Sequence, residues 1–433
     1  MKYATYNEYK PSNISWIRDF PAHWELKRLK WIANRAEVKV EADEYNPLPY
    51  IGLEQVESWT GRLINLDEEL VPTGVSNRFS AGDTLFGKLR PYLAKACNVD
   101  FDGLCSSELL VLRGKTYDRK FLLYQLLSHG FINLVDSSTY GSKMPRASWD
   151  FIGICELPLP PIDEQQTIAR FLDAKTAQID ALVAQNRQLI DKLKEKRQAL
   201  IARTVTRGLP PEAAKAAGLE PNPKMENAEE GWIGEMPVHW KAKKGSHLGR
   251  LIGSVAPAED DITEDDDGVP YAKVDDLNFL DSSLRLTSTK VRLKCAPPRW
   301  NTIILFPKRG AAIFTNKVAL AQQVTFDSNL MGWEIYKDSD PKFVAYCLIA
   351  RRLDDLADVS TVPQINNKHI YPAKFPHPPR CEQEAIVAFL DSETTRIDRL
   401  VGHVEGAISR LTEYRQALIT FAVTGKIDAR GLA

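Results

Sequence analysis

Two segments in the first half of the chain are rich in basic and polar side chains of the types that can contact nucleic acid. The candidate contact residues are Lys88, Arg90 and Lys95 in the first segment and Tyr140, Ser142, Lys143 and Arg146 in the second. Arg and Lys side chains bind guanine edges in the major groove and also pair with phosphates. Solvent-exposed loops have a similar composition. The residue types alone therefore leave a DNA contact and a solvated loop both open.

The second half of the chain has a comparable set of side chains, with more amides. Its candidates are Lys308, Arg309, Asn316, Lys317, Gln364, Asn366, Asn367 and Lys368. Asn and Gln favour adenine, so this set is chemically suited to different bases. The segment from Gln364 to Lys368 occupies the place that Ser142 to Arg146 hold in the first half. This paired placement favours two surfaces that read DNA.

Motifs for catalysis are incomplete or missing. The segment Gly82–Leu89 nearly fits a phosphate-binding P-loop, but Leu89 replaces the Ser or Thr hydroxyl that binds magnesium. No G-x-G occurs for a nucleotide cofactor, and the seven histidines form no H-E-x-x-H. His23 and His239 each precede a tryptophan, and we expect them to pack against it. The sequence predicts no catalytic residue, no metal ligand and no cofactor bound by this chain.

Composition limits the class of protein. The chain has 433 residues, 44% of them hydrophobic, and a formal net charge of −1, which indicates more than one globular core and no polycation. The polar N-terminus has no signal peptide, and the apolar runs are too short for a membrane span, so we expect a cytoplasmic protein. The acidic run Glu259–Asp267 is predicted to be an exposed loop. Buried thiols are predicted at the six scattered cysteines, Cys97, Cys105, Cys155, Cys295, Cys347 and Cys381.

The elements that must position these side chains occur twice. Trp16–Trp24 and Trp232–Trp240 share Trp, Ile, Pro, His and Trp in one register. Pro160–Gln165 and Pro378–Gln383 share Pro-Pro-x-x-Glu-Gln, and each copy continues to an Arg-Gln-Ala-Leu-Ile segment. The residues between these matched ends differ strongly. The sequence therefore predicts a duplicated unit with a shared frame and divergent middle parts.

Each Pro-Pro is followed by a helical apolar pattern. Apolar residues recur at alternating steps of four and three, which is typical of a coiled coil. The predicted seams are Ile168, Leu172, Ile179, Leu182, Leu189, Leu193 and Leu200 in the first copy and Ile386, Leu390, Ile397, Leu400, Val404, Ala407, Leu411 and Leu418 in the second. About forty residues give a rod of about 60 Å. We expect the two helices to pair antiparallel within the chain, although pairing between chains has the same signature.

The divergent middle parts mix strands and helices. Thr84–Phe86 and Thr302–Phe306 are predicted to be buried strands, and Phe121–Leu127 and Phe343–Ile349 are predicted to be helices. The predicted fold class is therefore α+β, with two globular domains joined by two long antiparallel coiled-coil helices in a pseudo-twofold duplication. The predicted boundaries are 1–158 for domain 1, 159–208 for the central helix, 209–230 for an exposed linker, 231–376 for domain 2, 377–424 for the distal helix and 425–433 for a C-terminal tail.

This combination resembles the DNA-specificity subunits of type I restriction–modification systems. The resemblance is carried by the two Trp-to-Trp segments, the two Pro-Pro-x-x-Glu-Gln helices, and the segments Gly82–Lys95 and Gly141–Trp149. It covers nearly the whole chain. The resemblance implies a non-catalytic protein whose two target-recognition domains each read one half of a bipartite, asymmetric site in double-stranded DNA.

The resemblance also implies partners. The paired helices would set the distance between the two half-sites and would dock two modification (methyltransferase) subunits, and restriction (motor-nuclease) subunits would join for cleavage. S-adenosylmethionine, ATP and magnesium would belong to those partners, which methylate adenine and cleave DNA. Two other hypotheses stay open: a two-domain protein-interaction scaffold with a coiled-coil stalk, and a self-contained methyltransferase. Sequence-selective DNA binding separates the first from the scaffold.

Overall fold

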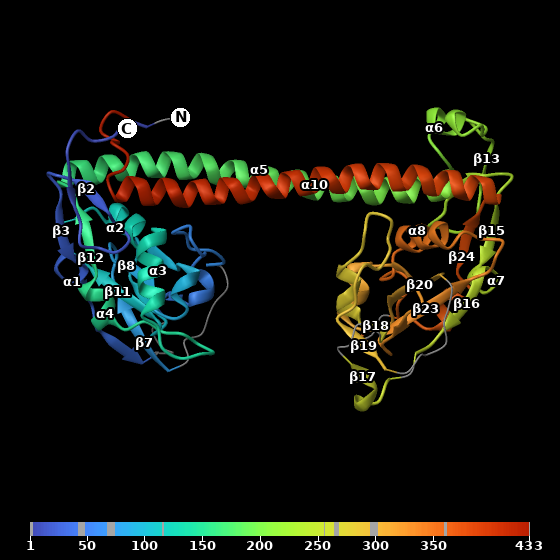
Figure 1. Ribbon diagram of the computed structural model, residues 1–433, viewed down its shortest axis with the longest axis horizontal. Coiled ribbons are helices and arrows are strands. Elements are labelled where there is room, and N and C mark those ends of the chain that lie inside the picture. Colours follow the sequence, from blue (N-terminus) through green and yellow to red (C-terminus); the bar gives the residue numbers. More distant parts are fainter. Residues whose placement is uncertain are drawn as a thin grey trace. The chain divides into compact units, whose positions relative to one another are not determined.

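The computed structural model describes residues 3–41, 48–66, 74–114, 117–254, 256–263, 268–294, 302–358 and 362–432. The chain divides into two compact units: unit 1 is 1–186 with 407–433, and unit 2 is 187–406. Helices α5 (Ile162–Arg207) and α10 (Arg380–Val423) each contribute one end to each unit (Figure 1). Helices and strands are mixed in both units, which confirms the predicted α+β class.

Unit 1 is built on two four-stranded sheets. Their orders are β5-β7-β10-β6 and β4-β11-β8-β9, and two further strand pairs, β1-β2 and β12-β3, flank them. The strands are β1 (Tyr9–Pro11), β2 (Asp19–Pro21), β3 (Glu25–Arg28), β4 (Asn34–Arg35), β5 (Lys39–Glu41), β6 (Tyr50–Ile51), β7 (Val75–Phe79), β8 (Thr84–Gly87), β9 (Ala96–Asn98), β10 (Gly103–Cys105), β11 (Leu109–Arg113) and β12 (Glu156–Leu159). The short helices are α1 (Leu29–Ile32), η1 (Leu53–Gln55), η2 (Pro91–Leu93), α2 (Arg119–Leu126), α3 (His129–Ser137) and α4 (Trp149–Ile154).

In unit 1 the sheet β4-β11-β8-β9 is buried on both faces; the second sheet, β5-β7-β10-β6, covers one face and helices cover the other. Side chains alternate along a strand, so Leu85 and Val111 face the second sheet while Phe86 and Leu110 face the helices. Helices α2 and α3 cover this second face (Figure 1). Helix α2 begins at Asp118, whose carboxylate accepts the first backbone N–H groups. The predicted strand Thr84–Phe86 and the predicted helix Phe121–Leu127 are thus confirmed as parts of β8 and α2.

The first part of α5 and the last part of α10 pack together in unit 1. Ile168, Leu172 and Ile179 of α5 share one apolar cluster with Leu418 and other residues of α10. Helix α10 is followed by a left-handed glycine, Gly425, with φ +73°.

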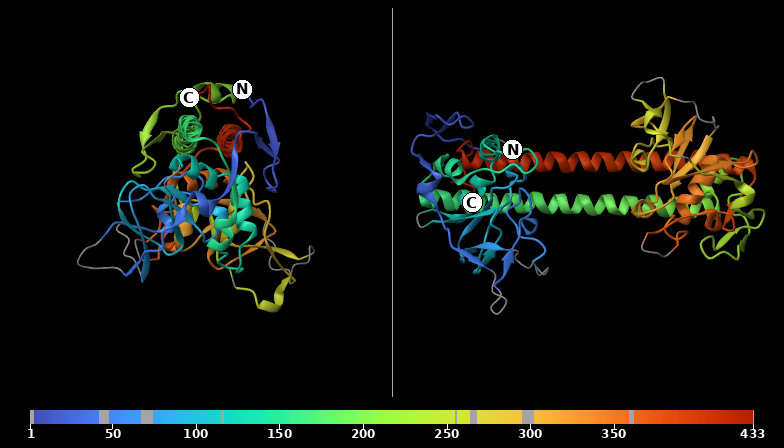
Figure 2. Two further views of the ribbon diagram at one scale, coloured as in Figure 1. Left: turned by 90° about the vertical axis from the view of Figure 1, so that its left-hand side faces the viewer. Right: turned by 90° about the horizontal axis from the view of Figure 1, so that it is seen from below.

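The residues that follow α10 continue into this cluster. They were predicted to be a tail, but Ile427 and Ala429 are buried, and Asp428 N donates to Ala4 O at 2.9 Å. The N- and C-terminal segments therefore lie side by side (Figure 2).

Unit 2 also has two four-stranded sheets; β16-β23-β20-β21 repeats the order of β4-β11-β8-β9, while the other sheet has a different order of its inner and edge strands. Their orders are β16-β23-β20-β21 and β17-β19-β18-β22, with the flanking pairs β13-β14 and β15-β24. The strands are β13 (Met225–Asn227), β14 (Glu235–Pro237), β15 (Lys241–Lys244), β16 (Gly249–Ile252), β17 (Ile262–Thr263), β18 (Val269–Ala272), β19 (Val291–Leu293), β20 (Thr302–Pro307), β21 (Ala319–Gln322), β22 (Thr325–Phe326), β23 (Leu330–Ile335) and β24 (Lys374–His377). The short helices are α6 (Pro211–Ala216), α7 (Gly245–Leu248), η3 (Glu259–Asp261), η4 (Val274–Asn278), η5 (Ala311–Thr315), α8 (Pro341–Arg351) and α9 (Asn367–Ile370).

The core of unit 2 repeats the alternation seen in unit 1. Ile303 and Leu305 of β20 face the second sheet, while Ile304 and Phe306 face the helices. Asp340 caps α8 as Asp118 caps α2. The predicted strand Thr302–Phe306 and helix Phe343–Ile349 are confirmed as parts of β20 and α8. The same cluster also contains residues from the end of α5 and the start of α10.

The repeated Glu-Gln pair explains why the two ends of each unit match. In unit 1, Glu164 accepts hydrogen bonds from Trp24 Nε1 at 3.1 Å and from Tyr6, and it lies 2.9 Å from His23 Nε2. In unit 2, Glu382 lies 2.8 Å from both Trp240 Nε1 and His239 Nε2.

The neighbouring glutamines also have equal roles. Gln165 accepts from Asp118 N at 2.9 Å, and Gln383 accepts from Asp340 N at 2.7 Å. Each histidine ring also packs edge-on against its tryptophan, at 6.4 Å between centroids. The motif therefore joins the start of each long helix to the globular part of its unit.

The predicted linker and the predicted helix seams differ from the structure. Residues 209–230, predicted as an exposed linker, belong to unit 2 and contain α6 and β13. Ala214 and Ala228 are buried, and Ala228 is part of the apolar cluster of unit 2. In the predicted seams, Leu182, Leu189 and Leu400 are 45–47% exposed. These leucines lie in the middle of the long helices, away from the clusters that bury the helix ends.

Cys381 is exposed, since it lies in the first turn of α10, whereas Cys97, Cys105, Cys155 and Cys347 are buried. Burial raises the pKa of the Cys97 thiol to about 12. Cys295 lies outside the described residues. The acidic run predicted as a loop forms η3 and β17 as far as Thr263, and 264–267 lie outside the described residues. Among the described residues, no helix is both long enough and apolar enough to cross a membrane.

Candidate nucleic-acid interface

In unit 1 the two predicted contact segments lie against each other. Arg90 N donates to Pro145 O at 2.7 Å, and Ala147 N donates to Lys88 O at 3.0 Å. The second segment is closed by reciprocal backbone bonds between Tyr140 and Arg146, at 3.1 and 3.0 Å. Backbone pairing therefore unites segments that are some fifty residues apart in the sequence into one surface.

The tip of the second segment is open to solvent, while Lys88, Arg90 and Arg146 are half-buried. Tyr140 is 64% exposed, and Ser142, Lys143 and Met144 are exposed as well. An exposed aromatic ring beside flexible cations is suited to stacking on a base while the cations bind phosphate. These exposed residues make the first candidate surface of the chain.

Arg146 is held by a carboxylate that the sequence did not reveal. Its Nε lies 3.1 and 3.2 Å from the two oxygens of Glu108, which raises the pKa of the Arg146 guanidinium. Glu108 also accepts the backbone N–H of Lys88 at 3.0 Å through its carbonyl. The pair orients the guanidinium in the absence of DNA. No periodicity links Glu108 to Arg146, so only the folded chain identifies this partner.

The conformation of Arg90 is unusual for a residue with a side chain. Its φ and ψ are 49° and 63°, in the left-handed region, and it precedes Pro91, which disfavours helical backbone in the preceding residue. In unit 2 the corresponding turn begins at Gly310, with φ +79°. A glycine would adopt this conformation more easily in unit 1 too. Arg90 therefore combines local strain with a position on the candidate surface.

We predict that Arg90→Gly separates stability from binding. The left-handed strain of about 1–2 kcal/mol is relieved, and the greater freedom of glycine in the unfolded chain offsets part of this gain. Thermal unfolding is expected to occur at the same or a higher temperature, while affinity for DNA falls about tenfold because one cation is lost.

Arg90→Ala is the matched control. It loses the same cation and keeps the strain, so affinity should fall without any gain in stability. Unfolding is measured by calorimetry and binding by fluorescence anisotropy on a duplex. Unchanged affinity in both variants would remove Arg90 from the interface.

Lys95 was predicted to contact DNA, but its ammonium group is already bound within the protein. Its ammonium group donates to the carbonyl of Leu53 at 2.6 Å, and partial burial lowers its pKa. The backbone carbonyl of Lys95 accepts from Gly87 N at 2.7 Å. These bonds give Lys95 a role in joining η1 to the end of β8.

Unit 2 brings its own predicted segments together in the same way. Gly310 N donates to Pro363 O at 2.9 Å, and Ile365 N donates to Lys308 O at 2.8 Å. Arg309 and Gln364 form an isolated bridge, and both are exposed. The second candidate surface is therefore built from the same places in the fold as the first, with different side chains.

The end of this second surface contains a charge cluster. Lys368 Nζ lies 3.0 Å from Asp358 Oδ2, and His369 Nε2 lies 3.0 Å from Asp358 Oδ1. The hydrogen bond from Lys368 is the largest of the effects that lower the pKa of the Asp358 carboxyl. Asp358 thus resembles Glu108 in orienting a predicted contact cation. Asn367 and Lys368 are exposed, and Asn366 is half-buried at the start of α9.

Asn316 was predicted to contact a base, but its side chain binds the protein backbone. Its Nδ2 donates to Ile349 O at 2.9 Å, and its Oδ1 accepts from Leu353 N at 3.0 Å. Both ends of the amide are therefore used to bind the end of α8, because Asn316 follows a turn that packs there. Its neighbour Lys317 is hydrogen-bonded to Asn278. Within the described residues, no cluster of three or more His, Cys, Asp or Glu side chains could hold a metal ion.

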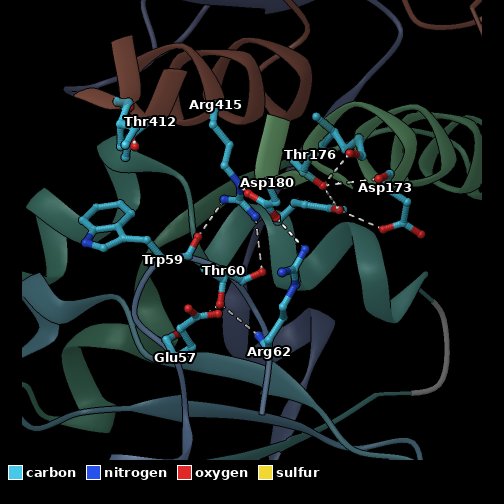
Figure 3. Close-up of polar contacts among 12 residues, drawn as sticks. Glu57, Trp59, Thr60, Arg62, Asp173, Thr176, Asp180, Thr412 and Arg415 are labelled. Carbon is cyan, nitrogen blue, oxygen red and sulfur yellow. Dashed lines mark hydrogen bonds and ion pairs between the residues drawn. The ribbon is translucent and has the colours of Figure 1, made fainter. Parts of the chain in front are cut away.

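A buried arginine connects the long helices to unit 1. Arg415 of α10 donates from Nε to Asp180 Oδ1 at 2.9 Å and from Nη1 to the carbonyl of Trp59 at 2.7 Å (Figure 3). Arg62 donates to the other oxygen of Asp180 at 2.6 Å. The side chain of Arg415 is only 7% exposed. In unit 2 the corresponding pair is Arg197 and Asp398, at 3.1 Å.

Part of the chain matches a known protein family. The family described as type I restriction modification DNA specificity domain matches residues 21–194. The chain is 24% identical to the type I restriction enzyme EcoDI specificity subunit of Escherichia coli, over 46% of this chain and 45% of that relative. It is 22% identical to the type I restriction enzyme MjaVIII specificity subunit of Methanocaldococcus jannaschii, over 98% of each chain.

A solved structure has the same fold. It is described as showing complex assembly and conformational transition of the type I R-M system, and it is 18% identical with a TM-score of 0.71, covering 94% of this chain and 99% of that chain. Residues 21–194 are therefore similar to the DNA specificity domain that this family describes. The chain is a relative of the specificity subunits of type I restriction–modification systems, which confirms the resemblance found in its sequence.

Proposed function

We propose that this chain is the non-catalytic subunit that selects the DNA sequence for a type I restriction–modification complex. Each unit reads one half of a bipartite, asymmetric site. The observation that carries the proposal is the pair of candidate surfaces: equal places on equal sheets, with different exposed side chains. A duplicated reader needs this combination, since two unlike half-sites require one frame and two sets of contacts.

The two long helices set the distance between the half-sites in this proposal. They would pair antiparallel as a coiled coil about a pseudo-twofold axis, and the continuity of α5 over 46 residues supports such a rigid spacer. The contacts at their ends support the pairing: Asp180 of α5 with Arg415 of α10 in unit 1, and Arg197 of α5 with Asp398 of α10 in unit 2. The predicted domains 1–158 and 231–376 are the two readers, and the helices 159–208 and 377–424 form the spacer.

In this proposal, partner subunits carry out the methylation and cleavage reactions. Two methyltransferase subunits would dock on the chain and bind S-adenosylmethionine, and restriction subunits would supply ATP- and magnesium-dependent cleavage in the cytoplasm. The exposed leucines Leu182, Leu189 and Leu400 are available on the helices for such docking. The relatives named above as specificity subunits support this division of labour.

Selection from a pool of duplexes with randomised positions tests the proposal. The full-length chain, purified with the methyltransferase subunits of its own genome, is expected to enrich one motif with two specified parts and an unspecified gap. Binding should weaken steeply with salt because phosphate contacts release counterions. Enrichment of no motif would leave the protein-interaction scaffold as the better hypothesis. Methylation by the purified chain alone would instead show that it is an enzyme.

A further inference from the structure

Each candidate surface begins with a turn of the same construction. In unit 1 the turn η2 lies between β8 and β9 and ends at Ala94, with φ 46°. In unit 2 the turn η5 lies between β20 and β21 and ends at Asn316, with φ 50°. Both end residues are left-handed without being glycine; this conformation costs energy for Ala94, while asparagine adopts it more readily. The contacts that hold these two turns therefore matter for the surfaces that they carry.

In unit 1 the end of the turn is connected to a long helix through Trp59. The carbonyl of Ala94 accepts from Trp59 N at 3.0 Å, and the carbonyl of Trp59 accepts from Arg415 Nη1 at 2.7 Å. Arg415 also donates to the carbonyl of Thr60 at 3.4 Å and is itself fixed by Asp180 of α5 (Figure 3). Two consecutive hydrogen bonds thus lead from α10 to the turn that begins at Arg90.

In unit 2 the end of the turn is connected to a long helix through Ile349. The carbonyl of Ile349 accepts from Asn316 Nδ2 at 2.9 Å and from Gln198 Nε2 of α5 at 3.0 Å. Again two hydrogen bonds separate the turn from a long helix. The connection again consists of two hydrogen bonds, but it reaches the side chain of the last residue of the turn, whereas in unit 1 it reaches the backbone carbonyl.

The two connections use neighbouring positions of one repeated motif. Arg415 is the first residue of the second Arg-Gln-Ala-Leu-Ile segment, and Gln198 is the second residue of the first. Arg197, the counterpart of Arg415, binds Asp398 at 3.1 Å. We call η2 and η5 the recognition turns. Each copy of the motif therefore supplies one residue that is connected to a recognition turn: Arg415 through Trp59 in unit 1, and Gln198 through Ile349 in unit 2.

We propose that Arg415 and Gln198 are positioning residues that determine sequence selectivity without touching DNA. Each fixes the left-handed end of one recognition turn to a long helix, and so sets the orientation of the contact side chains at the start of that turn. Base recognition requires contact groups to be held within about 0.5 Å, which a strained turn achieves only with external support. This inference rests on the proposed function, because it concerns which unit reads which half-site.

A positioning role and a purely stabilising role of these residues lead to different expected results. If Arg415 and Gln198 only stabilised the fold, their variants would bind every sequence less tightly. Positioning residues instead affect the preference for particular bases, each in one half of the site only. The readout is therefore the base preference at each position, measured beside the affinity.

Selection from the same randomised duplex pool provides the test, with the full-length chain and its methyltransferase subunits. Arg415→Lys keeps a cation beside Asp180 but loses the planar group that reaches the carbonyls of Trp59 and Thr60. Gln198→Glu keeps the size and loses the donor to Ile349. Each variant is expected to reduce discrimination about tenfold in one half of the motif, and the two variants in opposite halves. Arg197→Lys and Gln416→Glu, the same changes in the other copy, are the controls and should keep both halves.

The outcomes are separable. A wild-type chain that selects no bipartite motif contradicts the proposed function itself. A wild-type bipartite motif with both variants unchanged, or with both halves degraded equally in each, overturns the positioning role. Circular dichroism confirms that each variant is folded. If Arg415→Lys does not fold, Arg415→Gln and Asn316→Asp test the same two connections, with the same outcomes.

Discussion

Replacing Arg146 or Lys143 by alanine is expected to weaken recognition of one half-site and to leave the other half-site unchanged. Both residues lie on the candidate surface of unit 1, and Lys143 is exposed there. A lost base contact removes about 1–3 kcal/mol of discrimination, roughly 5- to 150-fold at the affected position. The larger effect is expected for Arg146→Ala, because this change also leaves the carboxylate of Glu108 facing the DNA without its partner.

Asn366→Ala and Lys368→Ala provide the matched experiment in unit 2. They should weaken the other half-site, and Lys368→Ala should again have the larger effect, because Asp358 loses the Lys368 ammonium group and keeps only His369 as a partner. Affinities for duplexes substituted in one half or the other, measured at fixed salt, check all four changes. Equal weakening at every sequence would identify the four residues as phosphate contacts rather than base contacts.

Shortening the two long helices by one heptad each is expected to change the preferred gap between half-sites. A heptad is about 10 Å long at 1.5 Å per residue, which corresponds to about three base pairs at 3.4 Å each. Asp180 contacts Arg415, and Arg197 contacts Asp398. In an antiparallel pair these contacts place 404–410 of α10 opposite 185–191 of α5. Removing both segments keeps the pairing contacts at either end and shortens only the middle.

The gap is measured with a series of duplexes that differ only in the number of base pairs between the half-sites. Wild type should prefer one gap, and the shortened chain should prefer a gap smaller by about three. A variant in which the same two heptads are replaced by other heptads of equal length is the control and should keep the original gap. An unchanged preference in the shortened chain would contradict the proposed spacer.

Much of the fold follows from local patterns in the sequence. The buried strand Thr302–Phe306 is a continuous apolar run, which strands covered on both faces require. Helix α5 begins directly after Pro160-Pro161 and ends before Gly208. Proline before a helix and glycine after it are recognisable signals for the start and the end of a helix. The duplication was visible because Glu164 and Glu382 make the same hydrogen bonds in both units. Such repeated contacts preserve residue type and spacing together.

Other features depended on neighbours that are distant in the sequence. Ala228 was expected in an exposed linker but is buried, because a short segment can still pack on a core that is formed by other parts of the chain. Leu182 was expected in a seam but is 47% exposed, since the heptad pattern does not report how far a partner covers it. Local periodicity therefore predicted the elements better than it predicted their burial.

The candidate site shows the same division. Residue types identified the segments around Lys88, Arg146 and Lys368 as suited to DNA, and the backbone brings the segments of each unit together. Asn316 was expected to contact bases, but its amide holds the end of α8. An amide has the same hydrogen-bonding groups for a base and for a backbone. Only its position relative to Ile349 and Leu353 separates the two roles.

The sequence by itself determined the kinds of elements, their order, their repetition and the chemical character of the two candidate surfaces. These properties are written in residue type and in spacing along the chain, where apolar periodicity and turn residues act locally. The tertiary structure decided which side chains meet: Glu108 with Arg146, and Arg415 with the carbonyl of Trp59. Such pairs form between segments that only folding brings within hydrogen-bond distance, so no local pattern encodes them.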